Sequence, residues 1–207
     1  MPAKNTKADL RRRLRAQRAA LSPAEQMLAS ERLTFNVTHS HQFRVSRRIS
    51  CYLANDGEID PQAVMERMWD MRKTCYLPVL PRLSGDYLWF APAEPGTPLA
   101  QNRFGIPEPV VPARDLVRAQ QLDLVLLPLV GFDENGNRLG MGGGFYDRSL
   151  LFLRNRKIWR KPNLIGIAHD FQRVDSLAAK PWDMPLDTVI TDRAVYTISY
   201  AQSPACK

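Results

Sequence analysis

Short apolar runs and amphipathic stretches alternate along this chain, with polar turns between them. Four of the apolar runs have the length and the branched residues of buried strands, namely 48–54, 75–80, 122–130 and 163–168. Two further strands are predicted at 86–90 and 195–199. Buried strands that alternate with helices are typical of a parallel sheet, so the pattern predicts an α/β fold.

The helical stretches between these runs have recognisable start signals. Ser22-Pro23-Ala24-Glu25 is a capping box with proline at the first helical position, and the helix that it opens is predicted to reach about Val37. Asp60-Pro61 has the pattern of a cap and first residue of a helix. The apolar side chains of that second helix are predicted to pack in the core, and they are Val64, Met65, Met68 and Met71.

The length of 207 residues, 44% of them hydrophobic, suits one substantial core. Without an internal repeat or a low-complexity linker, the prediction is a single three-layer domain over residues 1–207, with a mostly parallel sheet covered by helices on both faces. No apolar run approaches the length of a membrane span. Cys51, Cys75 and Cys206 lack the spacing of a metal site and indicate a reducing compartment, which predicts a cytoplasmic protein.

A glycine-rich stretch from Gly131 to Arg148, GFDENGNRLGMGGGFYDR, joins the run 122–130 to a helix that is predicted to begin near Phe145. Adjacent glycines let bare N–H groups approach a bound anion, and the N-terminus of the helix adds positive charge. Arg138 offers a planar fork that suits phosphate oxygens, and Asp147 offers a carboxylate that suits a divalent cation. Together these features predict a nucleotide-phosphate site with Mg²⁺.

A simpler interpretation of the same stretch is a mobile glycine loop, in which Asp147 only favours the first helical turn. Standard nucleotide motifs do not match it. No lysine follows the glycines as GxxxxGK[ST] requires, and Phe145 occupies the last glycine position of GxGxxG. A Walker-type ATPase and a dinucleotide-binding protein are therefore both disfavoured.

The formal net charge of +8 favours an anionic partner, and the basic excess is concentrated near the N-terminus. The only acidic residue in this part of the sequence is Asp9, and the seven basic residues are Lys4, Lys7, Arg11, Arg12, Arg13, Arg15 and Arg18. Leu10, Leu14 and Leu21 form a narrow apolar stripe, enough to dock one helix. A transit peptide, a nucleic-acid arm and a solvated helix face with one or two functional cations all fit this composition, and the last is favoured.

Two polar residues follow predicted strands, at the sheet edge where ligands of open α/β sheets bind. Glu58 follows the first strand and is placed for a substrate contact, although a solvated turn acid is the alternative. His169 follows the strand at 163–168, and we assign it no catalytic role.

The glycine-rich stretch resembles the signature of the 5-formyltetrahydrofolate cyclo-ligase family, GFD-x-x-G-x-RLG-x-G-x-G-[FY]-YD after a strand that ends in proline. This chain supplies each element, namely Pro128, Gly131-Phe132-Asp133, Gly136, Arg138-Leu139-Gly140, Gly142, Gly144, Phe145, Tyr146 and Asp147. Further similarities are Lys7-x-x-Leu10-Arg11, Glu58-Ile59, the stretch 102–109 and the stretch 182–191. Phe104 and Trp182 differ from the family pattern, which has Trp (in eukaryotes) and His there.

The resemblance covers nearly the whole chain and implies the layered fold of sugar-phosphate isomerase and CoA-transferase-like proteins. It also implies a reaction, the ATP- and Mg²⁺-dependent cyclisation of 5-formyltetrahydrofolate to 5,10-methenyltetrahydrofolate with release of ADP and phosphate. The implied partners are small molecules, ATP as co-substrate and a reduced folate, with no membrane and no nucleic acid. Phosphorylation activates the formyl oxygen, and such a transfer depends on positioning and charge neutralisation more than on a nucleophile.

The resemblance further implies roles for individual residues. The catalytic residues are Arg138 and Tyr146. The ATP-binding residues are Lys7, Arg11, Arg138, Leu139, Gly140, Gly142, Gly143, Gly144, Phe145 and Tyr146. The substrate-binding residues are Leu53, Glu58, Met141 and Phe145, and the metal ligands are Asp147 and Asp183, with Asp187 as the alternative to Asp183.

Two other functions fit the sequence. One is a basic nucleic-acid-binding module that uses the N-terminal arm, although no helix-turn-helix, zinc or OB-fold pattern supports it. The other is a cyclo-ligase relative that acts on a changed substrate.

Overall fold

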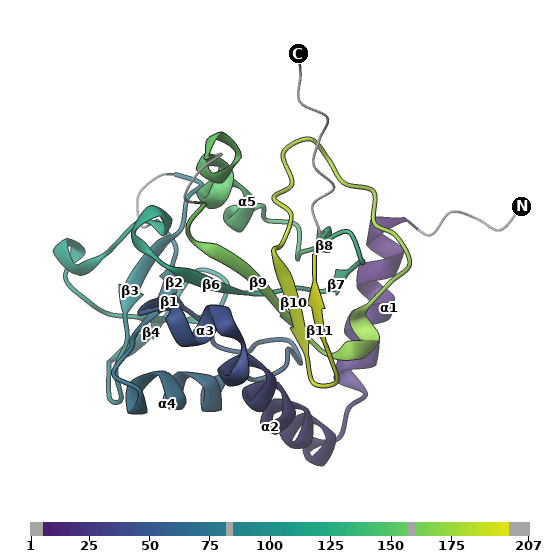
Figure 1. The fold of residues 1–207 in the computed structure, drawn as a ribbon, viewed down its shortest axis with the longest axis horizontal. Coiled ribbons are helices and arrows are strands. Elements are labelled where there is room, and N and C mark those ends of the chain that lie inside the picture. Colours follow the sequence, from purple (N-terminus) through teal and green to yellow (C-terminus); the bar gives the residue numbers. More distant parts are fainter. Residues whose placement is uncertain (1–5, 82–84, 157–159, 199–207) are drawn as a thin grey trace, which may run out of the picture.

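The computed structural model describes residues 6–81, 85–156 and 160–198 (Figure 1). These residues include a seven-stranded sheet of order β11-β10-β9-β6-β1-β2-β3. The inner pairings β10–β9, β9–β6, β6–β1 and β1–β2 are parallel, whereas β11 and β3 are antiparallel edge strands. The strands are β1 Arg48–Ser50, β2 Thr74–Val79, β3 Trp89–Pro92, β6 Leu124–Pro128, β9 Asn163–Ala168, β10 Thr188–Thr191 and β11 Val195–Thr197. The prediction of a mostly parallel sheet is confirmed.

The helices of the described residues are α1 Lys7–Ala19, α2 Pro23–His39, α3 His41–Val45, α4 Gln62–Asp70 and α5 Phe145–Leu150. Of these, α2 and α5 begin where the sequence signals place them. Capping boxes start α1 and α2, formed by Thr6 with Asp9 and by the predicted Ser22 with Glu25. Helix α4 begins at Gln62 with Pro61 at its cap position, so the predicted cap at Asp60 and first helical residue at Pro61 lie one residue too early. The Asp60 carboxylate does accept the N–H of Gln62 at 2.9 Å.

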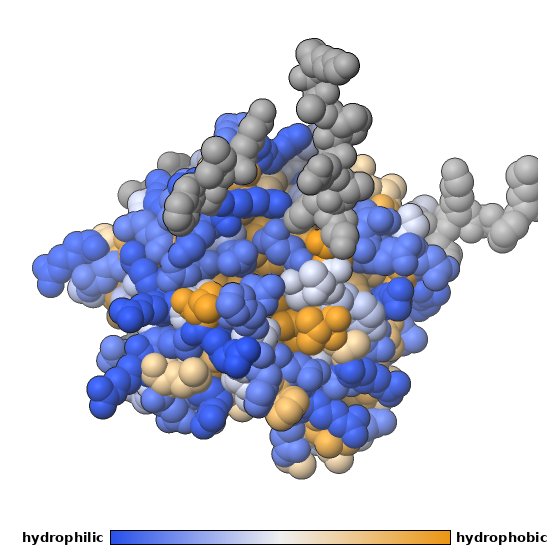
Figure 2. Space-filling view, viewed as in Figure 1, coloured by the Kyte–Doolittle hydropathy of each residue, from blue (hydrophilic) through white to orange (hydrophobic). Residues whose placement is uncertain are grey.

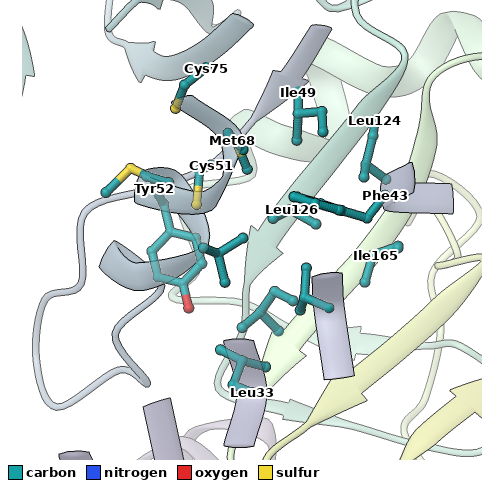
Figure 3. Packing of buried hydrophobic residues seen from close by; sticks show 14 of the residues in the cluster. Leu33, Phe43, Ile49, Cys51, Tyr52, Met68, Cys75, Leu124, Leu126 and Ile165 are labelled. Atoms are coloured by element: carbon teal, nitrogen blue, oxygen red, sulfur yellow. The ribbon is translucent and has the colours of Figure 1, made fainter. Parts of the chain in front are cut away.

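Helices α2, α3 and α4 cover one face of the sheet, and α5 lies on the opposite side (Figure 1). Alternate residues of β6 show the two layers directly. Leu124 and Leu126 pack with the three-helix side, where they meet Phe43 (Figure 3), while Val125 and Leu127 pack with the other side. All four β6 side chains are fully buried, as expected of a strand in the centre of a covered parallel sheet.

The structure corrects several of the predictions made from pattern alone, among them the first strand, which was predicted over 48–54 but ends at Ser50. Met71 follows the last residue of α4 and is 45% exposed, so its predicted core position is wrong, whereas Met65 and Met68 are buried. The predicted strand 122–130 ends at Pro128, because the chain then enters a hairpin of β7 Gly131–Phe132 and β8 Arg138–Leu139. A second small hairpin pairs β4 Leu99–Gln101 with β5 Pro107–Pro109.

In the described part of the chain, no helix has the length and apolar character needed to cross a membrane. Figure 2 shows one face of the molecule, which is mostly hydrophilic with small separate hydrophobic patches. Cys51 and Cys75 are buried free thiols within the core, and Cys206 lies outside the described residues.

Candidate active site

The carboxyl ends of the parallel strands bring distant polar residues to one edge of the sheet. Because β1, β6, β9 and β10 run in the same direction, the segments that follow them leave at the same edge. These segments carry Glu58 after β1, Arg138 after β6, His169 after β9 and Asp192 after β10. The candidate active site is built at this edge.

The β7–β8 hairpin after β6 is organised by the buried carboxylate of Asp133. This side chain accepts hydrogen bonds from the N–H groups of Asn135, Asn137 and Leu177 at 3.0, 3.0 and 2.9 Å, and from the Asn137 amide at 2.9 Å. Gly136 closes the turn with a φ of 78°, and a Cβ there would lie 2.8 Å from the Leu186 carbonyl oxygen. The motif residues Asp133 and Gly136 therefore shape the hairpin that presents Arg138.

We predict that Asp133→Asn destabilises the fold and the site together. An amide has one acceptor oxygen and one donor nitrogen, so at least one of the four donors around Asp133 loses its acceptor. Hydrogen bonds to charged groups contribute roughly 1.5–3 kcal/mol each, and we expect unfolding in urea to register a loss of about that size. Asp175→Asn, in the exposed segment next to Leu177, is the control. An unchanged urea midpoint for Asp133→Asn would contradict the role assigned to this carboxylate.

Arg138 is the central cation of the site, with only 6% of its side chain exposed. Its Nη2 lies 2.5 Å from Oδ1 of Asp147, and its Nη1 donates to the carbonyl oxygen of Met184. Oδ1 of Asp147 also accepts the Met184 N–H at 3.2 Å. Among the described residues, two of the five N–H donors of the guanidinium are therefore engaged, which leaves three for an anion.

Helix α1 brings Lys7 and Arg11 to the same place. Lys7 Nζ lies 3.7 Å from the carboxylate of Asp183, and Arg11 Nε donates to the Gly140 carbonyl oxygen at 2.8 Å. Both Asp147 and Asp183 raise the pKa of Arg138 by their charge, although its burial lowers that pKa by more. Lys7, Arg11 and Arg138, which are far apart in the sequence, thus converge with two carboxylates.

Three more basic residues of α1 are paired with carboxylates, whereas Arg13 is exposed, and this pairing disfavours a nucleic-acid arm. Arg12 binds Asp9, and Arg15 makes a two-pronged contact with Asp56 at 2.7 and 3.0 Å. Arg18, which is buried, reaches the same Asp56 carboxylate at 2.5 Å. The sequence analysis gave no role to Arg18 or Asp56, because nothing in the local pattern shows that this loop meets the helix.

The glycine loop is held at both ends. Arg11 binds the carbonyl oxygen of Gly140, and Arg148 binds that of Gly143 at 2.7 Å. Within the described ranges, the N–H groups of Gly140, Gly142, Gly143 and Gly144 donate to no acceptor. A Cβ would meet nothing within 4 Å at Gly140 or Gly142. These N–H groups are free to face an anion, so the attachment of the loop favours a binding loop over a merely mobile one.

Aromatic side chains border the glycine loop. Phe145 and the exposed Phe104 make an edge-to-face contact with ring centroids 6.3 Å apart, and Arg103 lies over both rings. The Tyr146 hydroxyl is buried and finds no hydrogen-bond partner in the described structure. Burial raises the pKa of Tyr146, the charge of Glu58 raises it further, and the charge of Arg138 lowers it. Tyr146 is therefore within electrostatic reach of both Glu58 and Arg138.

Glu58 is a buried acid, with 13% of its side chain exposed. Its carboxylate accepts the N–H of Asn55 at 3.2 Å and lies 3.9 Å from Nη1 of Arg18. Burial raises the pKa of Glu58 to about 7, against opposing effects of Asn55 and Arg18. A solvated acid in a turn would not have its pKa raised by burial. Acids with a raised pKa among other charged groups are typical of functional sites.

The two carboxylates near Arg138 fit a magnesium ion, which is commonly held by one or two carboxylates together with phosphate oxygens and water. No group of three or more metal-binding side chains occurs among the described residues, so the chain would rely on Asp147 and Asp183. The carboxylate of Asp187, the alternative to Asp183, accepts the Leu164 N–H at 2.7 Å and lies 3.5 Å from Arg160.

Three further residues lie outside the cluster of cations and carboxylates. Leu53 is half-buried against the three-helix core cluster, and Met141 is 54% exposed at the tip of the glycine loop. His169 is buried beside the Gly57 backbone, its pKa is lowered by burial, and its Nε2 has no partner in the described part of the chain.

Fold and site together define a class of protein: an α/β protein with one composite site, in which a glycine loop, converging cations and a buried acid meet at the carboxyl edge of a parallel sheet. The chain belongs to the 5-formyltetrahydrofolate cyclo-ligase family, whose model matches residues 3–192.

Individual relatives agree with this assignment over nearly their full length. The chain is 37% identical to 5-formyltetrahydrofolate cyclo-ligase of Escherichia coli, over 88% of this chain and 98% of that protein. The enzyme of the same name from Haemophilus influenzae is also 37% identical, with 87% and 95% covered. The solution structure of Aquifex aeolicus 5,10-methenyltetrahydrofolate synthetase is 29% identical and superimposes with a TM-score of 0.78, covering 95% of each chain.

Proposed function

We propose that this protein uses ATP and Mg²⁺ to convert 5-formyltetrahydrofolate to 5,10-methenyltetrahydrofolate, ADP and phosphate. The observation that carries this proposal is the convergence of Lys7, Arg11 and Arg138 near the glycine loop, whose N–H groups are open. The charges of both Arg138 and Glu58 act on Tyr146, which links these cations to the acid Glu58. One half of the site suits a triphosphate and the other suits the polar edge of a pteridine.

In the proposed reaction the formyl oxygen attacks the γ-phosphorus of ATP, and the bond from that phosphorus to the ADP oxygen breaks. The N10 nitrogen then attacks the activated formyl carbon, its proton is lost, and phosphate leaves. The protein supplies charge and position for both steps. Arg138, Lys7 and the glycine N–H groups face the negative charge that develops on the transferred phosphoryl group.

Asp147 and Asp183 would hold the Mg²⁺, which when bound neutralises phosphate charge. Phe145 and Phe104 offer flat surfaces beside the loop for an aromatic ring. Because Cys51 and Cys75 are free thiols, we also place the enzyme in the cytoplasm.

The test is formation of the methenyl product by the purified protein. We expect turnover with 5-formyltetrahydrofolate only when ATP and Mg²⁺ are both present, and loss of turnover on addition of a chelator. Turnover in the presence of excess chelator would remove Mg²⁺ from the proposal. If no product forms with all three components present, the substrate differs, and thermal-shift measurements with ATP alone would show whether the nucleotide half remains.

We predict that Glu58→Gln weakens folate binding and raises the stability of the fold at high pH. A carboxylate can accept two N–H donors from a pteridine edge, whereas an amide offers one acceptor and one donor, so the KM for the folate should rise while that for ATP stays nearly level. Glutamine also mimics the protonated acid that burial favours. The protonated form contributes stability fully below pH 4.5, and this contribution is lost as the pH rises through the folded pKa of about 7.

At pH 8, Glu58→Gln should therefore be more stable than the wild type, by up to about 3 kcal/mol, and near pH 4.5 the two should be alike. Chemical denaturation at both pH values measures this difference. Glu66→Gln, an exposed acid on α4, is the control. If the two proteins unfold alike at pH 8 and share one folate KM, Glu58 is only a turn residue.

A further inference from the structure

Helix α1 contacts both halves of the candidate site through one face. Lys7, Arg11, Leu14 and Arg18 are spaced by four, three and four residues, which places them in one row along a helix. Lys7 and Arg11 reach Asp183 and the glycine loop, and Leu14 is buried between them and Arg18. The last residue of the row, Arg18, lies at the opposite end of this face, beside the loop that carries Glu58.

The contacts of Arg18 leave part of its guanidinium free to act on Glu58. The residue is 1% exposed, and its Nη2 is 2.5 Å from the Asp56 carboxylate. Its Nη1 lies 3.9 Å from Oε1 of Glu58, and within the described residues neither Nη1 nor Nε has a hydrogen-bond partner. A buried guanidinium with a purely structural role is expected to have its donors satisfied. Here the open donors lie next to the acid of the site.

The backbone of the Glu58 loop is shaped to fit against this end of α1. Asp56 and Gly57 both adopt left-handed conformations, with φ of 53° and 70°. A Cβ at Gly57 would lie 3.2 Å from the Cβ of Arg18, so the loop touches the helix backbone directly. Gln26 of α2 donates to the Gly57 carbonyl oxygen at 3.2 Å and holds the loop from the other side. Asp56 fixes Arg18, and the turn that follows places Glu58.

We propose that Arg18 is a positioning residue of the folate half of the site, which holds the Glu58 carboxylate charged and oriented for the substrate. It acts through Glu58 and touches no reacting atom. The proposal rests on the function proposed above and extends it to a residue at the far end of α1.

The charges around Glu58 make Arg18 its main source of positive charge. The titratable groups that face Glu58 are Arg18 from α1, Asp56 from its own loop, Tyr52 beyond β1 and Tyr146 from α5. Asp56 raises the pKa of Glu58, Arg18 lowers it, and the two tyrosines are neutral at neutral pH. Removing Arg18 therefore raises the pKa of Glu58 further, so less of the acid is charged at neutral pH.

The test compares Arg18→Gln with Arg15→Gln. Arg15 binds the same Asp56 carboxylate but is exposed and has no contact with Glu58 among the described residues, so it controls for a general loss of charge on α1. For Arg18→Gln we expect the folate KM to rise about tenfold or more while the ATP KM stays within about twofold. The pH at which folate binding reaches half its maximum should move up by about one pH unit or more, as expected for loss of an opposite charge at this distance. Arg15→Gln should move neither.

Asp56→Asn provides a second route if Arg18→Gln does not fold. This change is at a partly exposed loop residue. It removes a charge that raises the pKa of Glu58 and frees Nη2 of Arg18 for the Glu58 carboxylate, so the pH profile of folate binding should move down, opposite to its movement in Arg18→Gln. Equal increases in both KM values, or a pH profile that does not move in either variant, would overturn the proposal and leave Arg18 as a structural residue.

A stability measurement keeps this test separate from the proposed function. The difference in unfolding free energy between wild type and Glu58→Gln reports the charge state of Glu58 without any substrate. The pH at which this difference appears should move upward in the Arg18→Gln background and downward in the Asp56→Asn background. If the wild type forms no methenyl product but this movement is seen, the reaction is wrong and the Arg18–Glu58 coupling stands. If product forms and the movement is absent, the coupling is wrong.

Discussion

Arg138→Met is expected to lower kcat/KM for ATP by about a hundredfold or more, while the folate KM changes by less than about threefold. Within the part of the chain that the structure describes, the guanidinium retains three free N–H donors after its contacts with Asp147 and Met184 are counted. Each charge-assisted hydrogen bond to phosphate contributes roughly 1.5–3 kcal/mol, and a forked pair therefore corresponds to about two or more orders of magnitude in rate. Steady-state kinetics with each substrate varied in turn measures both effects.

The comparison needs two further variants. Arg138→Lys keeps the positive charge but loses the planar fork, so it should recover only part of the loss. Arg114→Met removes an arginine whose side chain is 85% exposed, and it should behave as wild type. Equal loss of folate and ATP affinity in Arg138→Met, with the fold intact by circular dichroism, would show that the two halves of the site are not divided as proposed.

The sheet could be predicted from sequence because its central strands leave a pattern that depends on local composition alone. Strand β9 was predicted at its observed boundaries, and the α2 capping box fixed the start of that helix. The site residues came instead from a family resemblance, which assigned Lys7 and Arg11 to ATP binding. In the structure Arg11 contacts the glycine loop at Gly140, and Lys7 lies beside Asp183.

The hairpin and the buried arginine could not be predicted, because both depend on contacts between distant segments. Gly136 was grouped with the glycines of an anion-binding loop, but it is required where a turn passes the Leu186 carbonyl. Arg18 is one of several basic residues on α1, and its burial depends on Asp56, which is 38 positions away in the sequence. Periodicity identifies an apolar face, but it does not tell which cation next to that face finds a buried partner.

The same reasoning gives Asp147 a role that neither interpretation of the sequence contained. A helix cap and a metal ligand were the two alternatives, and the structure adds a third, because Asp147 is the counter-ion of the buried Arg138. Removing one partner of a fully buried ion pair costs roughly 3–5 kcal/mol. Asp147 retains 25% exposure of its side chain, so we discount this to about 1–3 kcal/mol for Asp147→Asn.

Asp147→Asn is therefore expected to lower both stability and turnover. The loss of stability should be reduced by a second substitution, and the loss of turnover by raised Mg²⁺. If the loss of stability comes from the unpaired guanidinium of Arg138, it should shrink in the double variant Asp147→Asn/Arg138→Met, because the two changes then remove the pair together. If the loss of turnover comes from a weakened magnesium site, raised Mg²⁺ should restore part of kcat in the single variant without changing its unfolding midpoint.

Asp183→Asn is the matched comparison, since that carboxylate faces Lys7 and is not hydrogen-bonded to Arg138 among the described residues. It should show the magnesium effect with little loss of stability. Wild-type stability in Asp147→Asn would rule out the counter-ion role, and a kcat that stays low at every Mg²⁺ concentration in both variants would place the metal on other ligands.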